Sequence, residues 1–393
     1  MKSIRRVSVF LLCIFLAGCV SVKAPEKVQF KFGADDDNDR PARKSLRQDH
    51  WADHGPKERH DNPPRRDTRP HRKRKSKWDI PADIASMIVG EGVERHIFYA
   101  YDVLTIPNRE VELVARIKSY ARDVDVEGIT LSFHRMRDGK RIGRAKTDAD
   151  GYASIHYNAG TPGTYRFFVK MARLGREHNP ALRDLPPALL LVAVRQRQTR
   201  FVVVDLDHTL VESSFFRVML WDGGKPMRGS QRVMQRIAET YEIIYLTHRP
   251  NDLTRTSRLW LEDKGYPDGV ILLSTARGML GDPGRFKSKR LKKIRRSFPR
   301  LVYGIGDKES DIEAYRDNGM TAIWIPHFKN TPKDVRKLAR QMRGWRDPNV
   351  IVVETWWQVK QVIFGNYRQT TSQFADILDA RAKELREEED EDD

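Results

Sequence analysis

Continuous apolar runs that end in polar residues set the pattern of the second half of the chain. The first run, Phe201–Val204, leads directly into Asp205 and Asp207. Similar runs follow, separated by segments with helical periodicity, at 242–246, 270–273, 301–305 and 321–325. Short apolar runs of this kind are typical of strands buried on both faces, and their alternation with helices indicates βαβ units. We therefore predict an α/β domain built on a parallel sheet over residues 199–365.

Residues 95–196 follow a different, two-residue period. Apolar residues alternate with mostly charged neighbours at Val111, Leu113, Ala115 and Ile117. Turn sequences separate further short runs: Asp138-Gly139-Lys140, Asp148-Ala149-Asp150-Gly151 and Gly160-Thr161-Pro162-Gly163. The first two of these are hairpin-turn signals, and the third is a further turn. Several short strands at near-regular spacing predict a β-sandwich. The order of turns and strands over 147–167 resembles extracytoplasmic Ig-like or prealbumin-like modules, which implies a spacing or binding role.

The first residues have the composition of a targeting segment. Positive residues, Lys2, Arg5 and Arg6, precede an apolar stretch that is too short to span a membrane. It ends in Leu16-Ala17-Gly18-Cys19, which resembles a bacterial lipobox. The resemblance implies a lipoprotein signal peptide over 1–18 and a lipid on Cys19; an ordinary secretory peptide is the alternative. Because Val20 rather than Asp follows the cysteine, similarity to Gram-negative lipoproteins favours the outer membrane, facing the periplasm.

Charge separates the N-terminal region from the domains. The chain has a net charge of +18, and residues 19–78 are polar, strongly basic and poor in aliphatic side chains. Such a segment cannot bury enough apolar surface to fold, so we predict a disordered tether. The tether would act as a spacer, contact anionic headgroups, or do both. An anionic membrane lipid is the expected partner, and nucleic acid is not. At the other end, 366–393 is predicted to form a helix and a disordered acidic tail.

Side chains suited to catalysis stand where the apolar runs of the α/β region end. Asp205 and Asp207 follow the first run, Thr247 and His248 the second, and Asp307 and Asp311 the fourth; Lys287 precedes a basic helix. The carboxyl ends of parallel strands meet at one edge of a sheet, where ligands bind. Carboxylates crowded at that edge repel one another unless a cation lies between them. The pattern predicts metal-assisted chemistry, with a solvated acidic turn as the plain alternative.

These motifs, in this order, resemble the haloacid dehalogenase (HAD) superfamily of phosphohydrolases. The resemblance implies that Asp205 attacks phosphorus and that Asp207 protonates the leaving oxygen and then activates water. Thr247, His248 and nearby backbone N–H groups would hold the phosphoryl oxygens, and Lys287 would neutralise charge, with Lys289 as a rival. Mg²⁺ would be held by Asp205, Asp207 (through its carbonyl), Asp307 and Asp311. The implied fold is a HAD-like Rossmannoid sheet without a large cap, preceded by the Ig-like sandwich.

Within that superfamily the sequence most resembles lipin-type phosphatidate phosphatases. The resemblance rests on 244–250, on 264–269, on 286–294, and on Tyr303-Gly304-Ile305-Gly306-Asp307 with Asp311. It implies a membrane lipid phosphate, such as phosphatidate, as substrate. About 18 residues separate Leu210 from Arg228, and about 21 separate Gly265 from Phe286, so neither gap fits a full cap. Lipins usually have Gly where His208 stands, and His208 could contact the phosphate or only pack.

Two other functions remain open at this point. One is a broad-specificity envelope phosphatase that acts on soluble phosphomonoesters or phosphoproteins. The other is a non-catalytic envelope scaffold in which the sandwich and the tether are the working parts. Substitution of Asp205 distinguishes a scaffold from an enzyme, and a comparison of lipid with soluble substrates distinguishes the two enzymes.

Overall fold

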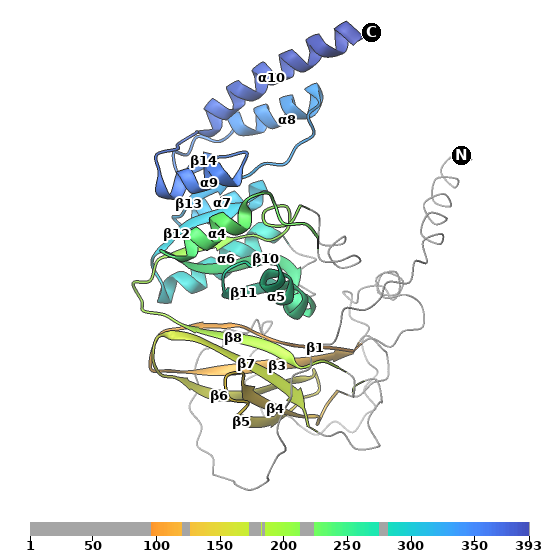
Figure 1. Ribbon diagram of the computed structural model, residues 1–393, viewed down its shortest axis with the longest axis vertical. Helices are drawn as coiled ribbons and strands as arrows, with labels where there is room; N and C mark the ends of the chain where they lie inside the picture. Colours follow the sequence, from red (N-terminus) through yellow and green to blue (C-terminus); the bar gives the residue numbers. More distant parts are fainter. Residues whose placement is uncertain are drawn as a thin grey trace, which may run out of the picture. The chain divides into compact units, whose positions relative to one another are not determined.

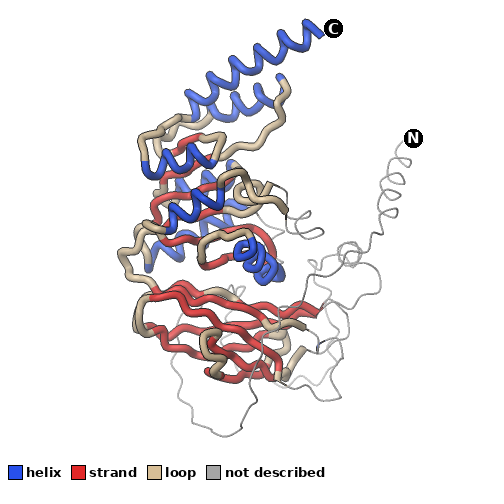
Figure 2. Tube along the Cα trace, in the orientation of Figure 1, coloured by secondary structure: helices blue, strands red, loops and turns tan. Residues whose placement is uncertain are grey.

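The computed structural model describes residues 96–119, 126–172, 182, 185–212, 224–274 and 282–392, all within one compact unit (Figure 1). The predicted signal peptide, Cys19 and tether lie outside these residues, as do 213–223 and 275–281 in the two gaps that bear on the absence of a cap. Along the chain, a region of strands comes first and a region of alternating strands and helices follows (Figure 2). No described helix combines the length and the apolar character that a membrane span requires.

Strands β1 to β8 form the predicted β-sandwich. One sheet is antiparallel and has the order β1-β3-β6. The other has the order β2-β8-β7-β4-β5 and is antiparallel except for β2, which pairs parallel with β8. The bounds are β1 His96–Ala100, β2 Val103–Thr105, β3 Arg109–Ser119, β4 Thr130–Arg135, β5 Arg141–Lys146, β6 Tyr152–Ala159, β7 Gly163–Met171 and β8 Ala188–Val194. Leu113, Phe133 and Val169 are fully buried in a core that both sheets share. The alternating pattern therefore identified this region correctly.

The turn residues predicted where the chain reverses, but they did not reliably predict which strands pair. Asp138–Lys140 joins β4 to β5, which pair antiparallel, so the first predicted hairpin is confirmed. The turn at Asp148–Gly151 joins β5 to β6, which belong to different sheets, and Gly160–Gly163 likewise joins β6 to β7. The hairpin predicted at Asp148–Gly151 is therefore wrong, whereas Gly160–Gly163 was predicted only as a turn, and it does connect two strands. An Asp-to-backbone turn fixes the local reversal, here with Asp148 accepting from the Tyr152 N–H at 2.9 Å, but burial decides which sheet the next strand joins.

The second half of the chain contains a six-stranded sheet in which every pair of neighbours is parallel, as predicted. Its order is β11-β10-β9-β12-β13-β14. The bounds are β9 Phe201–Val204, β10 Glu242–Pro250, β11 Gly269–Ser274, β12 Leu301–Gly306, β13 Thr321–Trp324 and β14 Val350–Val352. The chain builds outward from β9 in one direction and then in the other. The winding therefore reverses between β9 and β12, where doubly wound sheets bind their ligands.

Helices cover both faces of this sheet (Figure 1). Phe201 and Val203 of β9 pack into one core, and Val202 and Val204 pack into the other. The first core contains side chains of α6 (Pro283–Ser297), α7 (Glu309–Asp317), α8 (Pro332–Arg343) and α10 (Thr371–Asp392), the last packed on α8. The second contains side chains of α4 (Ser230–Ala238), α5 (Thr254–Asp263) and α9 (Trp356–Phe364). A short 3₁₀ turn, η2 (Asn251–Leu253), precedes α5.

Several element ends differ from the predicted ones. Strand β10 runs on through Thr247 and His248, whereas the sequence places its end at Leu246. Lys287 lies inside α6 rather than before it, because Asp282 caps the helix by accepting from the Arg285 N–H at 2.6 Å and Pro283 opens it. The acidic C-terminal residues continue α10 to Asp392 instead of forming a disordered tail.

Two glycines in β12 let helix α7 approach the sheet closely. A Cβ on Gly304 would lie 2.1 Å from the ring of Tyr315, and a Cβ on Gly306 would lie 2.8 Å from the Cβ of Asp311. Tyr315 is fully buried, and its hydroxyl donates to the Ile305 carbonyl at 3.3 Å. Because Gly304 and Gly306 have no side chain, α7, and with it Asp311, can lie close against β12.

Replacement of Gly304 by Ala should destabilise the fold. The added methyl group must displace the Tyr315 ring, and overpacking of this kind costs about 1–3 kcal/mol in the free energy of unfolding. Chemical denaturation of the two proteins measures this difference. Gly160→Ala is the matched control, because a Cβ at Gly160 meets no atom within 4 Å. Equal losses in the two variants would show that the close approach of α7 is unimportant.

Candidate active site

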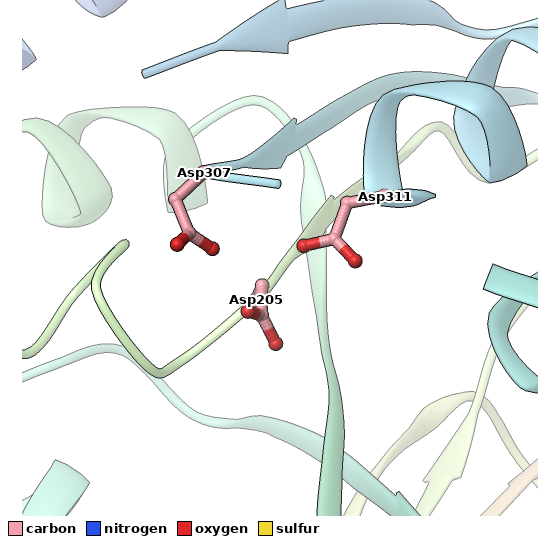
Figure 3. Close-up of side chains that lie close together, drawn as sticks. All are labelled: Asp205, Asp307 and Asp311. Carbon is pink, nitrogen blue, oxygen red and sulfur yellow. The ribbon is translucent and has the colours of Figure 1, made fainter. Parts of the chain in front are cut away.

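Three aspartates meet at the carboxyl ends of the two central strands. Asp205 directly follows β9, and its N–H donates to the Ile305 carbonyl of β12 at 3.0 Å. Asp307 directly follows β12, and Asp311 lies in the first turn of α7. One oxygen from each carboxylate lies within 4.8 Å of the others, and Figure 3 shows the three side chains directed toward a common space. We call Asp205, Asp307 and Asp311 the Asp cluster.

A buried lysine joins two members of the cluster. The Nζ of Lys287 lies 3.0 Å from Oδ1 of Asp205 and 2.7 Å from Oδ1 of Asp311. All three side chains are at most 5% exposed. Lys289, the rival for this role, is exposed on the same helix. The geometry therefore assigns the contact to Lys287, one turn inside the capped start of α6.

Burial and crowding raise the pKa of two members of the cluster, Asp205 and Asp307. Burial, with the charges of Asp311 and Asp207 acting against Lys287, raises the pKa of Asp205 to about 6. Burial and the charges of Asp205 and Asp311 raise the pKa of Asp307 to about 8. Burial lowers the pKa of Lys287, but the two carboxylates more than offset this and hold it well above its usual value. Lys287 is therefore a permanent cation in a site that still carries excess acid.

The charge and the donor set fit a divalent cation. When all three aspartates are ionised, Lys287 neutralises one of three negative charges, so two remain. Among the described residues, no hydrogen-bond partner reaches Oδ1 of Asp307 or Oδ2 of Asp311, although both atoms are buried. Carboxylate oxygens that lack partners in a buried site are costly unless a cation binds them. Mg²⁺ prefers such oxygens, so these residues could hold it.

The carboxylate of Asp207, which is not part of the Asp cluster, is bound by an arginine. Arg249 donates from Nε and Nη2 to the two carboxylate oxygens of Asp207, at 2.9 and 2.8 Å. Its Nη1 donates to Oγ of Ser257 in α5 at 3.1 Å. The Arg249 side chain is only 1% exposed, so this fork fixes the direction of the Asp207 carboxylate. The sequence analysis did not single out Arg249; its place two residues after Thr247 was the available signal.

The remaining predicted residues occupy the same edge of the sheet. Thr247 is fully buried in β10, two residues after Tyr245, which pairs with Val204 of β9. Its Oγ1 accepts from the Arg249 N–H at 3.3 Å. His248 is half-buried, with its ring centroid 5.7 Å from that of Phe286 in α6. Binding of phosphate by Thr247 and His248, and the use of the Asp207 carbonyl as a metal ligand, stay predictions.

His208 adopts a left-handed backbone conformation, with φ of 58°. Glycine reaches this conformation without strain, which explains why the lipin resemblance leads one to expect glycine here. His327 contacts the His208 carbonyl through Nε2, and the two imidazole centroids are 5.8 Å apart. Histidine tolerates positive φ better than most residues do. The unusual residue therefore has a clear backbone consequence, and its ring lies beside a second histidine.

Two tryptophans form hydrogen bonds with backbone carbonyls beside the site. Trp324 Nε1 donates to the Asp307 carbonyl at 2.8 Å, and Trp356 Nε1 donates to the Thr209 carbonyl at 3.0 Å. Trp356 is buried, whereas its neighbour Trp357 is 60% exposed. Trp356 is therefore packed inside the α/β domain.

One family model matches a part of this half of the chain. Residues 202–325 match the LNS2 domain of PITM 1-3. That family model describes a lipin-like domain with a HAD-related phosphatase fold, and the match spans every member of the Asp cluster together with Asp207, Thr247 and Lys287. No protein of curated function gives a significant match.

Solved structures resemble parts of the chain only distantly. A chain of the Pnkp1/Rnl/Hen1 RNA repair complex is 16% identical over 34% of this chain and 45% of its own length, with a TM-score of 0.27. The CARDB domain of the PF1109 protein from Pyrococcus furiosus is 13% identical over 26% of this chain and 93% of its own, with a TM-score of 0.18. The D0-D1 domain of Intimin is 14% identical over 28% and 58%, with a TM-score of 0.20. We conclude nothing about function from likenesses at this level.

Without a divalent cation, the protein should lose stability as the pH rises from about 4 to about 8. A carboxyl whose pKa is higher in the folded protein than in the unfolded chain stabilises the fold most at low pH. That contribution disappears as the pH passes the folded values, about 6 for Asp205 and about 8 for Asp307. Added Mg²⁺ should reduce the loss, because it binds the ionised form. Denaturation at several pH values, with and without Mg²⁺, measures both effects.

Asp307→Asn is the control for this pH dependence. The variant lacks the carboxyl with the higher pKa, so its stability should fall less between pH 6 and 8, and Mg²⁺ should stabilise it less than the wild type. The same slope and the same Mg²⁺ effect in both proteins would contradict a cation site at the cluster.

Substitution of His208 tests the left-handed turn. An alanine keeps the Cβ that disfavours positive φ, whereas glycine removes it at a gain of about 1–2 kcal/mol. His208→Gly should therefore be more stable than His208→Ala by about 1 kcal/mol in chemical denaturation. A more stable Ala variant would mean that the backbone at residue 208 does not hold this conformation in solution.

Proposed function

We propose that this chain is a Mg²⁺-dependent phosphomonoester hydrolase that acts through an aspartyl-phosphate on Asp205. The observation that carries the proposal is Lys287, buried between Asp205 and Asp311 with Asp307 beside them. A structural ion pair needs one carboxylate per lysine, whereas this one has an excess of acid at the ligand-binding edge of a doubly wound sheet. The LNS2 match over 202–325 supports a lipin-like activity in this same region.

The proposed reaction has two halves, and Asp205 and Asp207 act in both. An oxygen of Asp205 forms a bond to phosphorus while the bond to the leaving oxygen breaks, and Asp207 supplies the proton that this oxygen takes. Water then attacks phosphorus, Asp207 accepts the proton of that water, and phosphate departs with Asp205 restored. In the structure, Arg249 donates to both oxygens of the Asp207 carboxylate and so orients it. Phosphoryl transfer depends mainly on such positioning and on cations near the phosphoryl oxygens.

The metal would be held by the Asp cluster and the Asp207 carbonyl. Mg²⁺ bound there would neutralise charge on the phosphoryl oxygens, which is its usual contribution to phosphoryl transfer. Lys287 supplies a second positive charge next to Asp205, and its place in the capped helix α6 keeps it there without a solvent shell.

A membrane lipid phosphate such as phosphatidate is the substrate we favour. A groove of about 880 Å³ runs between α6 and α7, and the side of α6 that lines it carries Arg285, Lys289, Lys292 and Arg296. The groove does not include the Asp cluster, so we regard it as a source of attraction rather than as the reaction site. Helix α6 begins beside that site, so its cations favour the approach of an anionic surface. The predicted lipid on Cys19 and the basic tether would keep the domain at a membrane and raise the local concentration of lipid.

Asp205→Asn should reduce phosphate release by at least about a thousandfold, because no other group can take the place of the nucleophile. Release of inorganic phosphate, with Mg²⁺ and after its removal by a chelator, is the measurement. Asp138→Asn, in an exposed turn of the sandwich, is the matched control and should keep full activity. Undiminished release from every substrate by the Asp205 variant would rule out the enzyme and favour the scaffold.

The substrate is tested separately. Phosphatidate in mixed micelles should be hydrolysed with a higher kcat/KM than soluble p-nitrophenyl phosphate. An equal or lower value for the lipid would favour the broad-specificity phosphatase and would leave the role of Asp205 unaffected.

A further inference from the structure

We infer that the β-sandwich is a positioning element of the active site: through Asp102 and Lys118 it fixes the segment 251–258 and thereby the Arg249–Asp207 pair. The inference rests on the proposed function for the role of Asp207, but the contacts that carry it do not. It assigns to the sandwich a role that the sequence pattern, which suggested spacing or binding, did not contain.

Asp102 joins the sandwich to two elements of the α/β domain. It lies between β1 and β2, and its carboxylate is completely buried. Oδ1 accepts from the Leu191 N–H of β8 at 2.8 Å, and Oδ2 accepts from the Ile271 N–H of β11 at 2.7 Å. Oδ2 also accepts from Nη2 of Arg258 in α5. One carboxylate thus connects a sandwich strand, the edge strand of the parallel sheet and the helix that follows the Thr247 motif.

Lys118 makes a second contact with the same segment. Its Nζ lies 3.1 Å from Oδ2 of Asp252, and the two side chains are 17% and 9% exposed. Lys118 is on β3, and Asp252 is in η2, two residues after β10 ends. Apolar packing accompanies these pairs, since Leu104, Leu191 and Ala193 of the sandwich share a core with the parallel sheet. Segment 251–258 is therefore held at both of its ends.

The segment passes this constraint to the acid/base residue. Ser257 and Arg258 are consecutive in α5: Arg258 contacts Asp102, and Ser257 accepts from Arg249. Arg249 in turn holds both oxygens of Asp207. A small displacement of α5 moves Ser257 and therefore the guanidinium that orients Asp207. Misplacement of a catalytic group by about 1 Å can cost about a hundredfold in rate.

A purely structural interface makes a different prediction from a positioning one. Arg166 of β7 pairs with Asp268, which directly precedes β11, and both side chains are exposed. This pair also joins the sandwich to the α/β domain, but it does not touch 251–258. If the interface only stabilises the fold, removal of the Arg166 pair should have the same effect as removal of the Lys118 pair. If the sandwich positions Asp207, only the Lys118 and Asp102 contacts should affect the site.

The test uses the full chain with Lys118→Met and Asp102→Asn, and with Arg166→Gln as the matched control. Amide hydrogen exchange over 247–258 is measured first. In the two test variants it should be at least about tenfold faster than in the wild type, and in the Arg166 variant it should be unchanged. This readout does not depend on any activity, so it decides the coupling even if the wild type releases no phosphate.

Kinetics with p-nitrophenyl phosphate then test the positioning itself. In Lys118→Met, kcat should fall by about tenfold while KM stays within about twofold, because orientation of Asp207 matters in the transition state. Lys118→Arg should restore part of kcat. Should Asp102→Asn fail to fold, as judged by circular dichroism, the Lys118 pair and the control decide alone. Wild-type exchange in Lys118→Met, or equal losses in Lys118→Met and Arg166→Gln, would overturn the inference.

Discussion

The charge balance around Lys287 is the constraint on which the site depends. A lysine this deeply buried is tolerated only beside carboxylates, and Asp205 and Asp311 supply them at 3.0 and 2.7 Å. The arrangement requires that β9 and β12 be neighbours, that α6 begin early enough to carry Lys287 inward, and that α7 lie close against β12. The Asp282 cap, Pro283 and the two glycines of β12 meet these requirements. The acid in excess of Lys287 gives the site the charge and the oxygen donors that suit a divalent cation.

Local pattern and a topological rule were enough to predict the principal residues. Asp205 and Asp307 each end an apolar run, and runs that alternate with helices place their carboxyl ends at one edge of a parallel sheet. No long-range information was required for this. The start of α6 could also have been predicted, because Asp282 is a typical helix cap and Pro283 is a typical first-turn residue. The sequence analysis did not use this signal and therefore placed Lys287 before the helix.

Other features depend on contacts that no local pattern encodes. Arg249 reaches Asp207 across 42 residues, and Arg258 reaches Asp102 across 156. The partner sheets of β5, β6 and β7 likewise follow from burial in a shared core rather than from turn residues. An arginine or aspartate in isolation reads as a surface charge, so the sequence analysis passed over both. The lipid anchor, the tether and the absence of a cap concern residues outside those that the structure describes.

The carboxylate of Asp102 also has a consequence for how this architecture can change over time. Strand β11 forms one edge of the parallel sheet, and an exposed strand edge invites pairing with other chains. By accepting from the Ile271 amide, Asp102 covers part of that edge with a neighbouring module instead of a strand. An α/β domain protected in this way cannot exchange its sandwich for an unrelated module without exposing the edge of β11. Recombination should therefore transmit the two modules together, as a single heritable unit.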